Sequence, residues 1–298
     1  MLLCLIWGSS WIVIQDGLAR LPPLFGAGLR FLLAGVVMVA VSAALRGREG
    51  GEDPPTWLWL LIASSNFALS YGIIYIVQQT LPSGLVSVLW AVYPLMMAAT
   101  GHLLLPSERL RRGQWFGFVL GFLGVALLFD IDLASLRAGR ETALLLLLSP
   151  LCTAFGTTML KRHGSTSSSL VLNRNAMLFG GILLLLGSKL TGEPLDFTLD
   201  TRALLGLLYL SVFGTVATLG LYYWVLRYVP ANRLSLIAYV TPAIALLLGW
   251  AIAGEQVRAS TLAGTAMIFA GIALANLLSR SRSKSARSNE ALAKLREW

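Results

Sequence analysis

The chain has 298 residues, of which 56% are hydrophobic and 12% are charged, and its mean hydropathy is +0.74. These values lie outside the range of a soluble domain of this length and are typical of a membrane protein. The formal net charge of +9 would suggest a nucleic-acid partner in a soluble protein. In a membrane protein it is explained by topology and by attraction to anionic lipids.

Ten apolar segments are long enough to cross the roughly 30 Å hydrocarbon layer, since a helix needs about 18 to 20 residues at about 1.5 Å per residue. In chain order they are 1–18, 22–45, 57–79, 84–105, 113–130, 142–160, 168–188, 203–226, 233–253 and 260–279. The first segment begins at Met1 with no residue outside the bilayer, so a start of translation further upstream stays open. A signal peptide is the competing interpretation, and the lack of a basic n-region and of a small-residue cleavage site disfavours it.

Basic residues are distributed unevenly between the two sides of these segments. If the amino terminus is cytoplasmic, the loops and tail on the inner side hold most of the 23 lysines and arginines. Both termini are therefore expected in the cytoplasm, and the protein in the inner (plasma) membrane as a multi-pass protein. Residues 280–298 form a basic tail whose Arg-Ser alternation also suits RNA binding. Because the tail directly follows the last span and has one aromatic residue, Trp298, we expect it to contact the lipid bilayer and no nucleic acid.

Prolines, glycines and a few other residues of the first half of the chain recur in the same order in the second half. The stretch LPSGLVSVLWAVYP at 81–94 has a counterpart, VPANRLSLIAYVTP, at 229–242, in which both prolines and one serine recur 148 residues later. Further glycines recur in the same order, and Arg30 has a looser counterpart in Arg174. The order of these matches predicts two homologous halves.

Each predicted half contains five helices, and because five is odd, the second half must enter the membrane from the opposite side. The expected fold is an all-α integral membrane protein with ten transmembrane helices arranged as two inverted five-helix repeats, 1–132 and 142–279. Glu108 and Glu255 would then lie on opposite faces of the membrane. Inverted repeats are common in secondary transporters, in which two equivalent gates open alternately around a central site.

Five stretches carry a resemblance to a known family. They are WGSSW (7–11), LPPLFGAGLRFLLAG (21–35), LPSGLVSVLWAVYPLMMA (81–98), SERL with GQWFGFVLGFLGVALL (107–128) and AYVTPAIALLLGWAIAGEQV (238–257). Together they resemble the EamA family of the drug/metabolite transporter superfamily, over nearly the whole chain. The resemblance implies a ten-helix inverted-repeat fold, cytoplasmic termini and export of small metabolites across the inner membrane, and it is compatible with a homodimer. In the second half, 149–162 has no tryptophan to match Trp7 or Trp11, so equal roles for the first and sixth helices are not implied.

Two prolines lie near the middle of their predicted spans, Pro94 in the fourth and Pro242 in the ninth. Proline removes a backbone donor and displaces the preceding turn, which leaves carbonyl groups near Trp90 and Ala238 without their usual partner. Lipid cannot satisfy these groups. The prolines therefore either kink tightly packed helices or border a polar cavity, and their symmetric placement favours the cavity.

Polar and aromatic residues recur at spacings of three or four on several predicted helices, so they share one face of each helix. Packing and anchoring at headgroup depth are the alternative roles for any one of them. The candidate substrate-binding residues are Trp7, Trp11, Arg30, Tyr71, Tyr75, Gln78, Trp90, Pro94, Thr157, Tyr222, Tyr239 and Pro242. Arg30 either snorkels to the headgroups or meets a helix end or a substrate carboxylate, which suits its planar fork.

The sequence also lacks the parts that several other functions need. No Asp or Glu lies in the middle of a predicted span, and His102 is the one intramembrane group that titrates near neutrality, most simply as a packed histidine. Cys4 and Cys152 have no metal-ligand spacing, HExxH and GxGD motifs are absent, and we expect no cofactor and no metal. The prediction is a secondary transporter of an amino acid-like or amphipathic, cationic compound and not an enzyme. A channel or a structural membrane subunit is the alternative, and an intramembrane enzyme is disfavoured.

Overall fold

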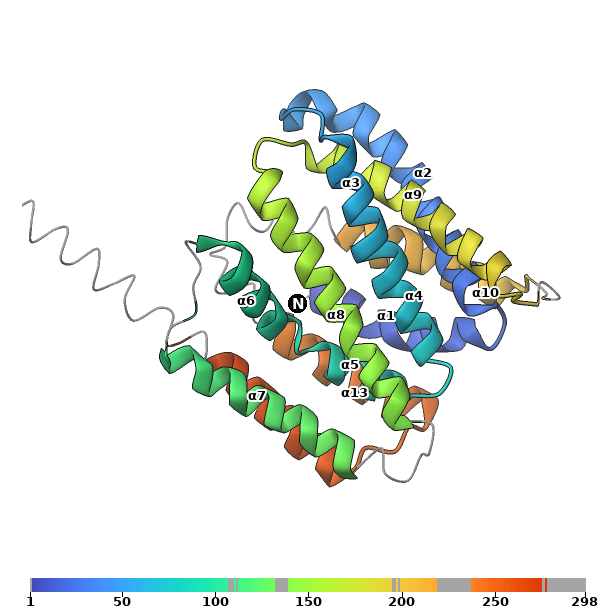
Figure 1. The fold of residues 1–298 in the computed structure, drawn as a ribbon. Coiled ribbons are helices and arrows are strands. Elements are labelled where there is room, and N and C mark those ends of the chain that lie inside the picture. The colour runs from blue at the N-terminus through green and yellow to red at the C-terminus, as the bar shows by residue number, and fades with distance from the viewer. Residues whose placement is uncertain are drawn as a thin grey trace, which may run out of the picture.

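The computed structural model describes residues 2–106, 110, 112–131, 139–194, 197, 199–218, 237–274 and 277. Apart from an isolated β-bridge between Glu52 and Ser167, the regular structure of these residues is helical. The helices, shown in Figure 1, are α1 (Leu2–Leu18), α2 (Pro23–Glu49), α3 (Thr56–Ile62), η1 (Ala63–Leu69), α4 (Ser70–Val77), α5 (Ser83–Trp90), α6 (Tyr93–Leu104), α7 (Arg112–Ile131), α8 (Gly139–His163), α9 (Ser169–Leu190), α10 (Thr201–Leu208), η3 (Tyr209–Ala217), α13 (Ile237–Ala253) and a last helix, Ala259–Leu274.

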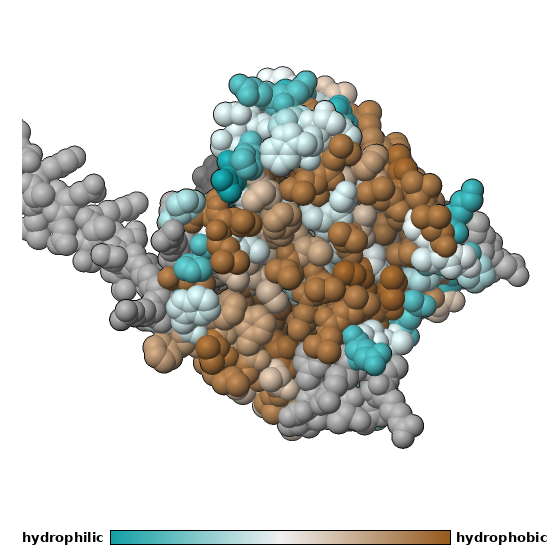
Figure 2. Space-filling model, viewed as in Figure 1, coloured by the Kyte–Doolittle hydropathy of each residue, from teal (hydrophilic) through white to brown (hydrophobic). Residues whose placement is uncertain are grey.

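The length and hydropathy of the helices fit a membrane-spanning bundle. Within the described residues, five helical stretches are long and apolar enough to cross a bilayer, and five shorter apolar helices accompany them. Large apolar side chains point outward, as Leu144, Leu148 and Phe155 do on α8. Hydrophobic residues cover most of the face seen in Figure 2, and hydrophilic residues gather toward its margins. The ten helical stretches follow the ten predicted segments in order, which confirms the all-α membrane fold.

The fourth span is interrupted just before Pro94. Helix α5 ends at Trp90 and α6 begins at Tyr93, because Pro94 has no N–H to donate to the carbonyl of Trp90. Pro242 does not produce the same interruption, since α13 runs through it without a break. Pro242 thus lies within a continuous helix, whereas Pro94 follows an interruption.

A π-helical segment lies at corresponding places in the third and eighth spans. Segment η1 follows α3, and η3 follows α10. Hydroxyl groups supplement the looser backbone pattern: Ser65 Oγ donates to the carbonyl of Leu61 at 2.7 Å, and Thr215 Oγ1 donates to the carbonyl of Leu210 at 2.8 Å. The sequence did not suggest these segments, which widen the helix locally and are frequent at functional sites.

Helices α2 and α9, the second span of each half, pack side by side and antiparallel (Figure 1). Glycines permit the close approach, since a Cβ atom on Gly28 would lie 3.1 Å from the carbonyl oxygen of Gly181 and 2.7 Å from Leu185. Small residues are favoured at such contacts because they let helix backbones approach in lipid.

The N-terminus of each of these two helices is capped by a glutamate at the C-terminal end of the other helix. Glu49, the last residue of α2, accepts the backbone N–H groups of Ser169 and Leu170 at the start of α9. Glu193, just beyond α9, accepts the N–H groups of Leu24 and Phe25 at the start of α2. This exchange between antiparallel elements is what an inverted repeat requires, and a carboxylate at a helix N-terminus also complements the helix dipole.

Helix α7 packs along the last helix, Ala259–Leu274, as the green and red ribbons show in Figure 1. A Cβ atom on Gly124 would lie 2.8 Å from the carbonyl oxygen of Gly264, and one on Gly271 would lie 2.5 Å from the carbonyl oxygen of Gly117 in α7. These glycines let α7 and the last helix approach closely within the subunit.

Candidate functional site

A row of aromatic rings lies inside the bundle, between α1 and the interrupted fourth span. The rings of Trp11 and Trp90 have centroids 6.2 Å apart, and Trp90 stacks on Tyr93 at 5.0 Å. Gln78, which is fully buried, donates its amide to the backbone carbonyl of Trp11 at 3.1 Å. Three of the predicted site residues are thus brought together from three spans.

A chain of hydroxyl groups extends from Trp90 between α5, α4 and α8. The indole N–H of Trp90 donates to Ser149 Oγ at 3.0 Å, Ser149 bonds to Ser70 at 2.8 Å, and Thr153 donates to Ser70 at 2.8 Å. Ser70 and Ser149 were not predicted as site residues. Serine is common in membrane helices, and only the contact between α4 and α8 shows that the two belong together.

Thr157 continues this polar interior along α8. It accepts a hydrogen bond from Asn66 Nδ2 at 3.2 Å, and the hydroxyl of Tyr93 lies 3.5 Å away. Asn66 comes from η1, so the widened turn of the third span presents a polar side chain to α8. A Cβ atom on Gly156 would collide with Asn66 and Ser65, so a glycine at this position leaves room for them.

Arg30 lies at the centre of a second cluster and is 1% exposed, so it does not snorkel to the surface. Its Nε and Nη2 atoms both donate to Thr215 Oγ1, each at 3.2 Å. The third nitrogen, Nη1, is buried and has no hydrogen-bond partner among the described residues. Thr215 belongs to η3, so the second π-helical segment also presents a polar side chain to the interior.

Aromatic rings flank this guanidinium. Its central carbon lies 4.9 Å from the ring centroid of Tyr71 and 5.2 Å from that of Phe31, within the range of cation–π attraction. Tyr75, one turn beyond Tyr71 on α4, is buried and interacts electrostatically with Arg30. The structure therefore joins Arg30, Tyr71 and Tyr75, all predicted site residues, in one cluster between α2, α4 and η3.

Two glutamines, the partly buried Gln15 and the buried Gln78, lie between the aromatic row and one end of the bundle. Gln15 donates its amide to the backbone carbonyl of Gln78 at 2.8 Å. With Gln78 bound to Trp11 in the same way, the side-chain oxygens of both glutamines are buried without a hydrogen-bond partner among the described residues. Unpaired buried polar atoms are uncommon and costly, which marks this position as functionally interesting.

Four charged side chains link α1 to the start of α10 at the same end of the bundle, which we call the Asp16 end. Asp16 pairs with Arg202 at 2.8 Å and with Arg20 at 3.1 Å, and Arg20 also pairs with Asp200 at 3.2 Å. The backbone N–H of Ala203 and, after it, the guanidinium of Arg20 hold the pKa of Asp200 below its ordinary value, against the opposing effect of burial.

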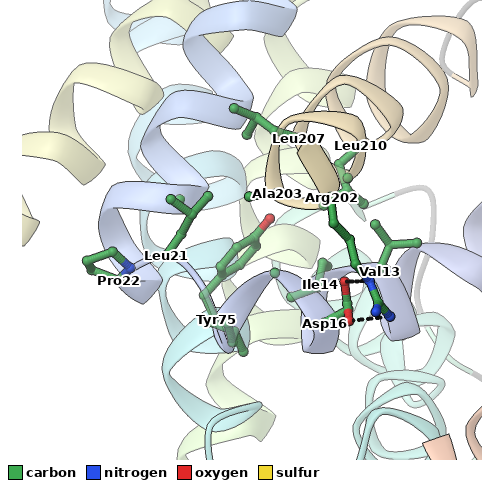
Figure 3. A pocket seen from close by; sticks show the side chains of 14 residues that line it. Val13, Ile14, Asp16, Leu21, Pro22, Tyr75, Arg202, Ala203, Leu207 and Leu210 are labelled. Carbon is green, nitrogen blue, oxygen red and sulfur yellow. Dashed lines mark hydrogen bonds and ion pairs between the residues drawn. The ribbon is translucent and has the colours of Figure 1, made fainter. Parts of the chain in front are cut away.

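A small cavity lies below these ion pairs, between α1, α2, α4 and α10. It encloses about 20 Å³, and its lining includes Asp16, Tyr75, Arg202 and Leu210. Figure 3 shows the ring of Tyr75 reaching toward α10 beside the Asp16–Arg202 pair. A space of this size holds about one water molecule, so little room is left between these residues at the Asp16 end.

The remaining predicted site residues belong to neither of the two clusters described above, or lie outside the described residues. Trp7 and Pro94 are partly buried, and Pro242 is buried in α13. Tyr222 and the side chain of Tyr239 lie outside the described residues. His102 accepts the backbone N–H of Leu110 at 2.8 Å, as expected for a packed histidine. In the described part of the chain, no group of His, Cys, Asp and Glu residues could hold a metal ion.

Comparison with known protein families identifies the family of the chain. The model of the EamA-like transporter family matches residues 1–130 and again residues 141–277. The chain belongs to the EamA-like transporter family.

Curated relatives cover most of this EamA family member. It is 30% identical over 257 residues to the uncharacterized inner membrane transporter YedA of Escherichia coli (strain K12), covering 85% of this chain and 81% of YedA. It is 28% identical over 284 residues to a probable amino-acid metabolite efflux pump of Salmonella typhimurium, covering 91% of each chain. A solved crystal structure shares the fold, with a TM-score of 0.66 and 18% identity over 94% of this chain and 96% of that one.

The family and the fold together establish a multi-pass membrane transporter of the drug/metabolite superfamily, and not an enzyme. Its partners are a small-molecule substrate and the bilayer. Two matches to one family model within an all-helical chain also agree with the internal repeat. Sequence reasoning missed Gln15, Ser70 and Ser149. Helical spacing could have pointed to two of them, since Gln15 follows Trp11 by four residues and Ser149 precedes Thr153 by four.

Proposed function

We propose that this EamA family member is a secondary transporter that exports a small metabolite by alternating access around the polar and aromatic interior. The substrate is amino acid-like or is an amphipathic, cationic compound. The observation that carries this proposal is the set of polar and aromatic groups inside the bundle: the cluster around buried Arg30, and the group that includes Gln78, Trp90 and Thr157. Aromatic walls suit apolar bodies and cations, and a few placed polar groups give orientation.

The two halves, which we place at 1–132 and 142–279, would move relative to each other. The basic residues of the loops favour cytoplasmic termini, which puts the Asp16 end outside the cell. In this proposal the Asp16–Arg202 and Arg20–Asp200 pairs form the outer gate, closed in this conformation above a cavity of about 20 Å³. The name of the Salmonella relative, an amino-acid metabolite efflux pump, supports the direction and the class of substrate.

The test is flux through the purified protein in liposomes. Trp90→Ala removes the ring that stacks on Tyr93 and the donor to Ser149, so flux is expected to fall about tenfold or more while the protein stays folded in detergent. Trp250→Ala is the matched control, because Trp250 is 60% exposed on α13. Equal flux in both variants would exclude Trp90 from the transport site.

The alternative prediction, a channel, differs in a measurable way. A transporter gives saturable uptake and counterflow, in which labelled substrate accumulates against unlabelled substrate on the other side of the membrane. A channel gives neither. The ion pairs that link α1 to the start of α10 at the Asp16 end support a gated transporter.

A further inference from the structure

We propose that an open cavity at the Asp16 end binds the headgroup of a phosphatidylethanolamine molecule, with the ammonium group at Glu193 and the acyl chains along α4 and α9. This lipid site goes beyond transport, and its lining shares no residue with the aromatic row or with the Arg30 cluster. Two observations carry it. They are the lining of the cavity and two exposed apolar stripes that end at it.

The cavity is large and is open to the surroundings of the protein. Its volume is about 540 Å³, within the range of about 300 to 1,000 Å³ that is usual for sites that bind small molecules. Its lining comes from the connection between α1 and α2, from the end of α4, and from the segment after α9 together with Phe197. The space is therefore large enough for a lipid headgroup.

Two stripes of exposed apolar side chains run along α4 and α9 toward this cavity. Leu69, at the end of η1, and Ile76, seven residues later on α4, are both exposed. Ile182, Leu186 and Leu190 are exposed on α9 at spacings of four. Residues at these spacings share one face of a helix. In a membrane protein such exposed apolar faces contact lipid chains.

The two stripes belong to helices that are in contact. A Cβ atom on Gly72 of α4 would lie 3.3 Å from Leu184 of α9, one turn before Ile76. Ile76 itself lines the cavity, and so does Thr191, the residue that follows the α9 stripe. A lipid whose chains lie along these stripes therefore has its headgroup at the cavity.

Glu193 gives the cavity a negative charge. Its two carboxylate oxygens accept backbone N–H groups of α2 at 2.9 and 3.0 Å, and no ion pair of Glu193 occurs among the described residues. Arg20, which also lines the cavity, is already paired with two aspartates at 3.1 and 3.2 Å. The C-terminal ends of α1, α4 and α9 at the cavity add the negative ends of three helix dipoles. The cavity therefore favours a positively charged group.

The lining also offers hydrogen-bond acceptors in preference to donors. Pro22, Pro23 and Pro194 have no backbone N–H. The hydroxyl of Thr191 donates to a carbonyl group of α9 at 2.9 Å, which leaves its lone pairs for a ligand. Each oxygen of Glu193 accepts one backbone N–H and keeps a further lone pair. A primary ammonium group, with three N–H donors, matches these acceptors.

These properties distinguish between common lipid headgroups. Phosphatidylethanolamine combines a primary ammonium group with a phosphate and has no net charge. Arg20 Nη2 makes no hydrogen bond with the described residues, so it is free to donate to the phosphate. Phosphatidylglycerol would bring a net negative charge next to Glu193. Phosphatidylcholine has a quaternary ammonium group without an N–H donor.

Native mass spectrometry of the full-length protein in detergent measures the preference. The protein is incubated with an equimolar mixture of phosphatidylethanolamine, phosphatidylglycerol and phosphatidylcholine that carry the same acyl chains. We expect phosphatidylethanolamine to be bound about fivefold or more over each of the others, because hydrogen bonds to a charged group are strong and partial exposure weakens them. Soluble glycerophosphoethanolamine, which lacks the acyl chains, should displace it only at a concentration about 100-fold higher or more.

Substitutions of the two capping glutamates then locate the site. Glu193→Gln removes the charge and should reduce the preference to less than about twofold. Glu49→Gln is the matched control, because Glu49 caps α9 as Glu193 caps α2 but does not line the cavity. It should keep the preference of the wild-type protein. Ala19→Phe leaves Glu193 in place and fills part of the cavity, so it should lower binding of phosphatidylethanolamine about fivefold.

Each outcome supports or overturns the lipid site. Equal binding of the three lipids by the wild-type protein would overturn it. Equal loss of preference in Glu193→Gln and Glu49→Gln would assign the effect to helix packing and overturn it as well. If Glu193→Gln does not fold, Ala19→Phe decides, and unchanged binding in that variant refutes the site. Displacement by an equal concentration of glycerophosphoethanolamine would refute the role of the acyl chains. All of these outcomes leave the proposed transport function standing.

Discussion

Replacing Glu49 by glutamine is expected to destabilise the contact between the two halves by about 3 kcal/mol. The carboxylate of Glu49 accepts hydrogen bonds from the backbone N–H groups of Ser169 and Leu170 and from the hydroxyls of Ser168 and Ser169. Hydrogen bonds to a charged group contribute about 1.5 to 3 kcal/mol each, and the charge at the helix N-terminus adds about 0.3 to 1 kcal/mol. Glu49 is partly exposed, so water replaces much of this sum in the variant.

Thermal unfolding of the purified protein in detergent measures the effect. About 3 kcal/mol corresponds to a fall in Tm of about 6 °C for a chain of this size. Glu193→Gln should lower Tm by about half as much, because Glu193 accepts only the two backbone N–H groups of Leu24 and Phe25 among the described residues. Glu52→Gln is the control. Glu52 is exposed and its carboxylate accepts one hydrogen bond, from Thr166 at 3.1 Å, so its loss should shift Tm by less than about 2 °C.

The order of these three shifts tests the reasoning. A Glu49→Gln variant that unfolds at the wild-type temperature would show that the reciprocal caps do not hold the halves together. A larger shift for Glu193→Gln than for Glu49→Gln would show that the number of hydrogen bonds does not set the magnitude.

Three further predictions concern other parts of the bundle. Gly124→Leu should lower Tm by several degrees, measured in detergent, because even a Cβ atom there would lie 2.8 Å from the carbonyl oxygen of Gly264; an unchanged Tm would mean that the helices can separate freely. The pKa of Asp200 is lowered in the folded state, chiefly by the N–H of Ala203, so its ion pair contributes at neutral pH and is lost as pH falls through that pKa. Hydrogen exchange at the start of α10 should therefore rise in acid, and a pH-independent rate, after correction for intrinsic exchange, would contradict this. Trp90→Phe keeps an aromatic ring and loses only the indole donor, so its flux should exceed that of Trp90→Ala; equal flux would assign the whole effect to the hydrogen bond.

Hydropathy and the internal repeat were enough to predict the ten helices and their division into two halves. Both signals are local, because the bilayer requires every span to be apolar along its own length. The interruption before Pro94 was predictable for the same reason, since a proline lacks a donor wherever it stands. Spacing along α4 also predicted that Tyr71, Tyr75 and Gln78 share a face.

The tertiary structure alone decided which of these residues work together. Arg30 meets Thr215, 185 residues away, and the choice between snorkelling and a buried role could not be made from α2 by itself. The π-helical segments, the hydroxyl chain through Ser149 and the exchange of caps by Glu49 and Glu193 were equally out of reach. Each depends on the side chain that a distant helix presents at one depth in the bundle. The apolar character of a segment is enough to predict that it spans the membrane. Which polar side chains form hydrogen bonds with each other depends on how the helices pack.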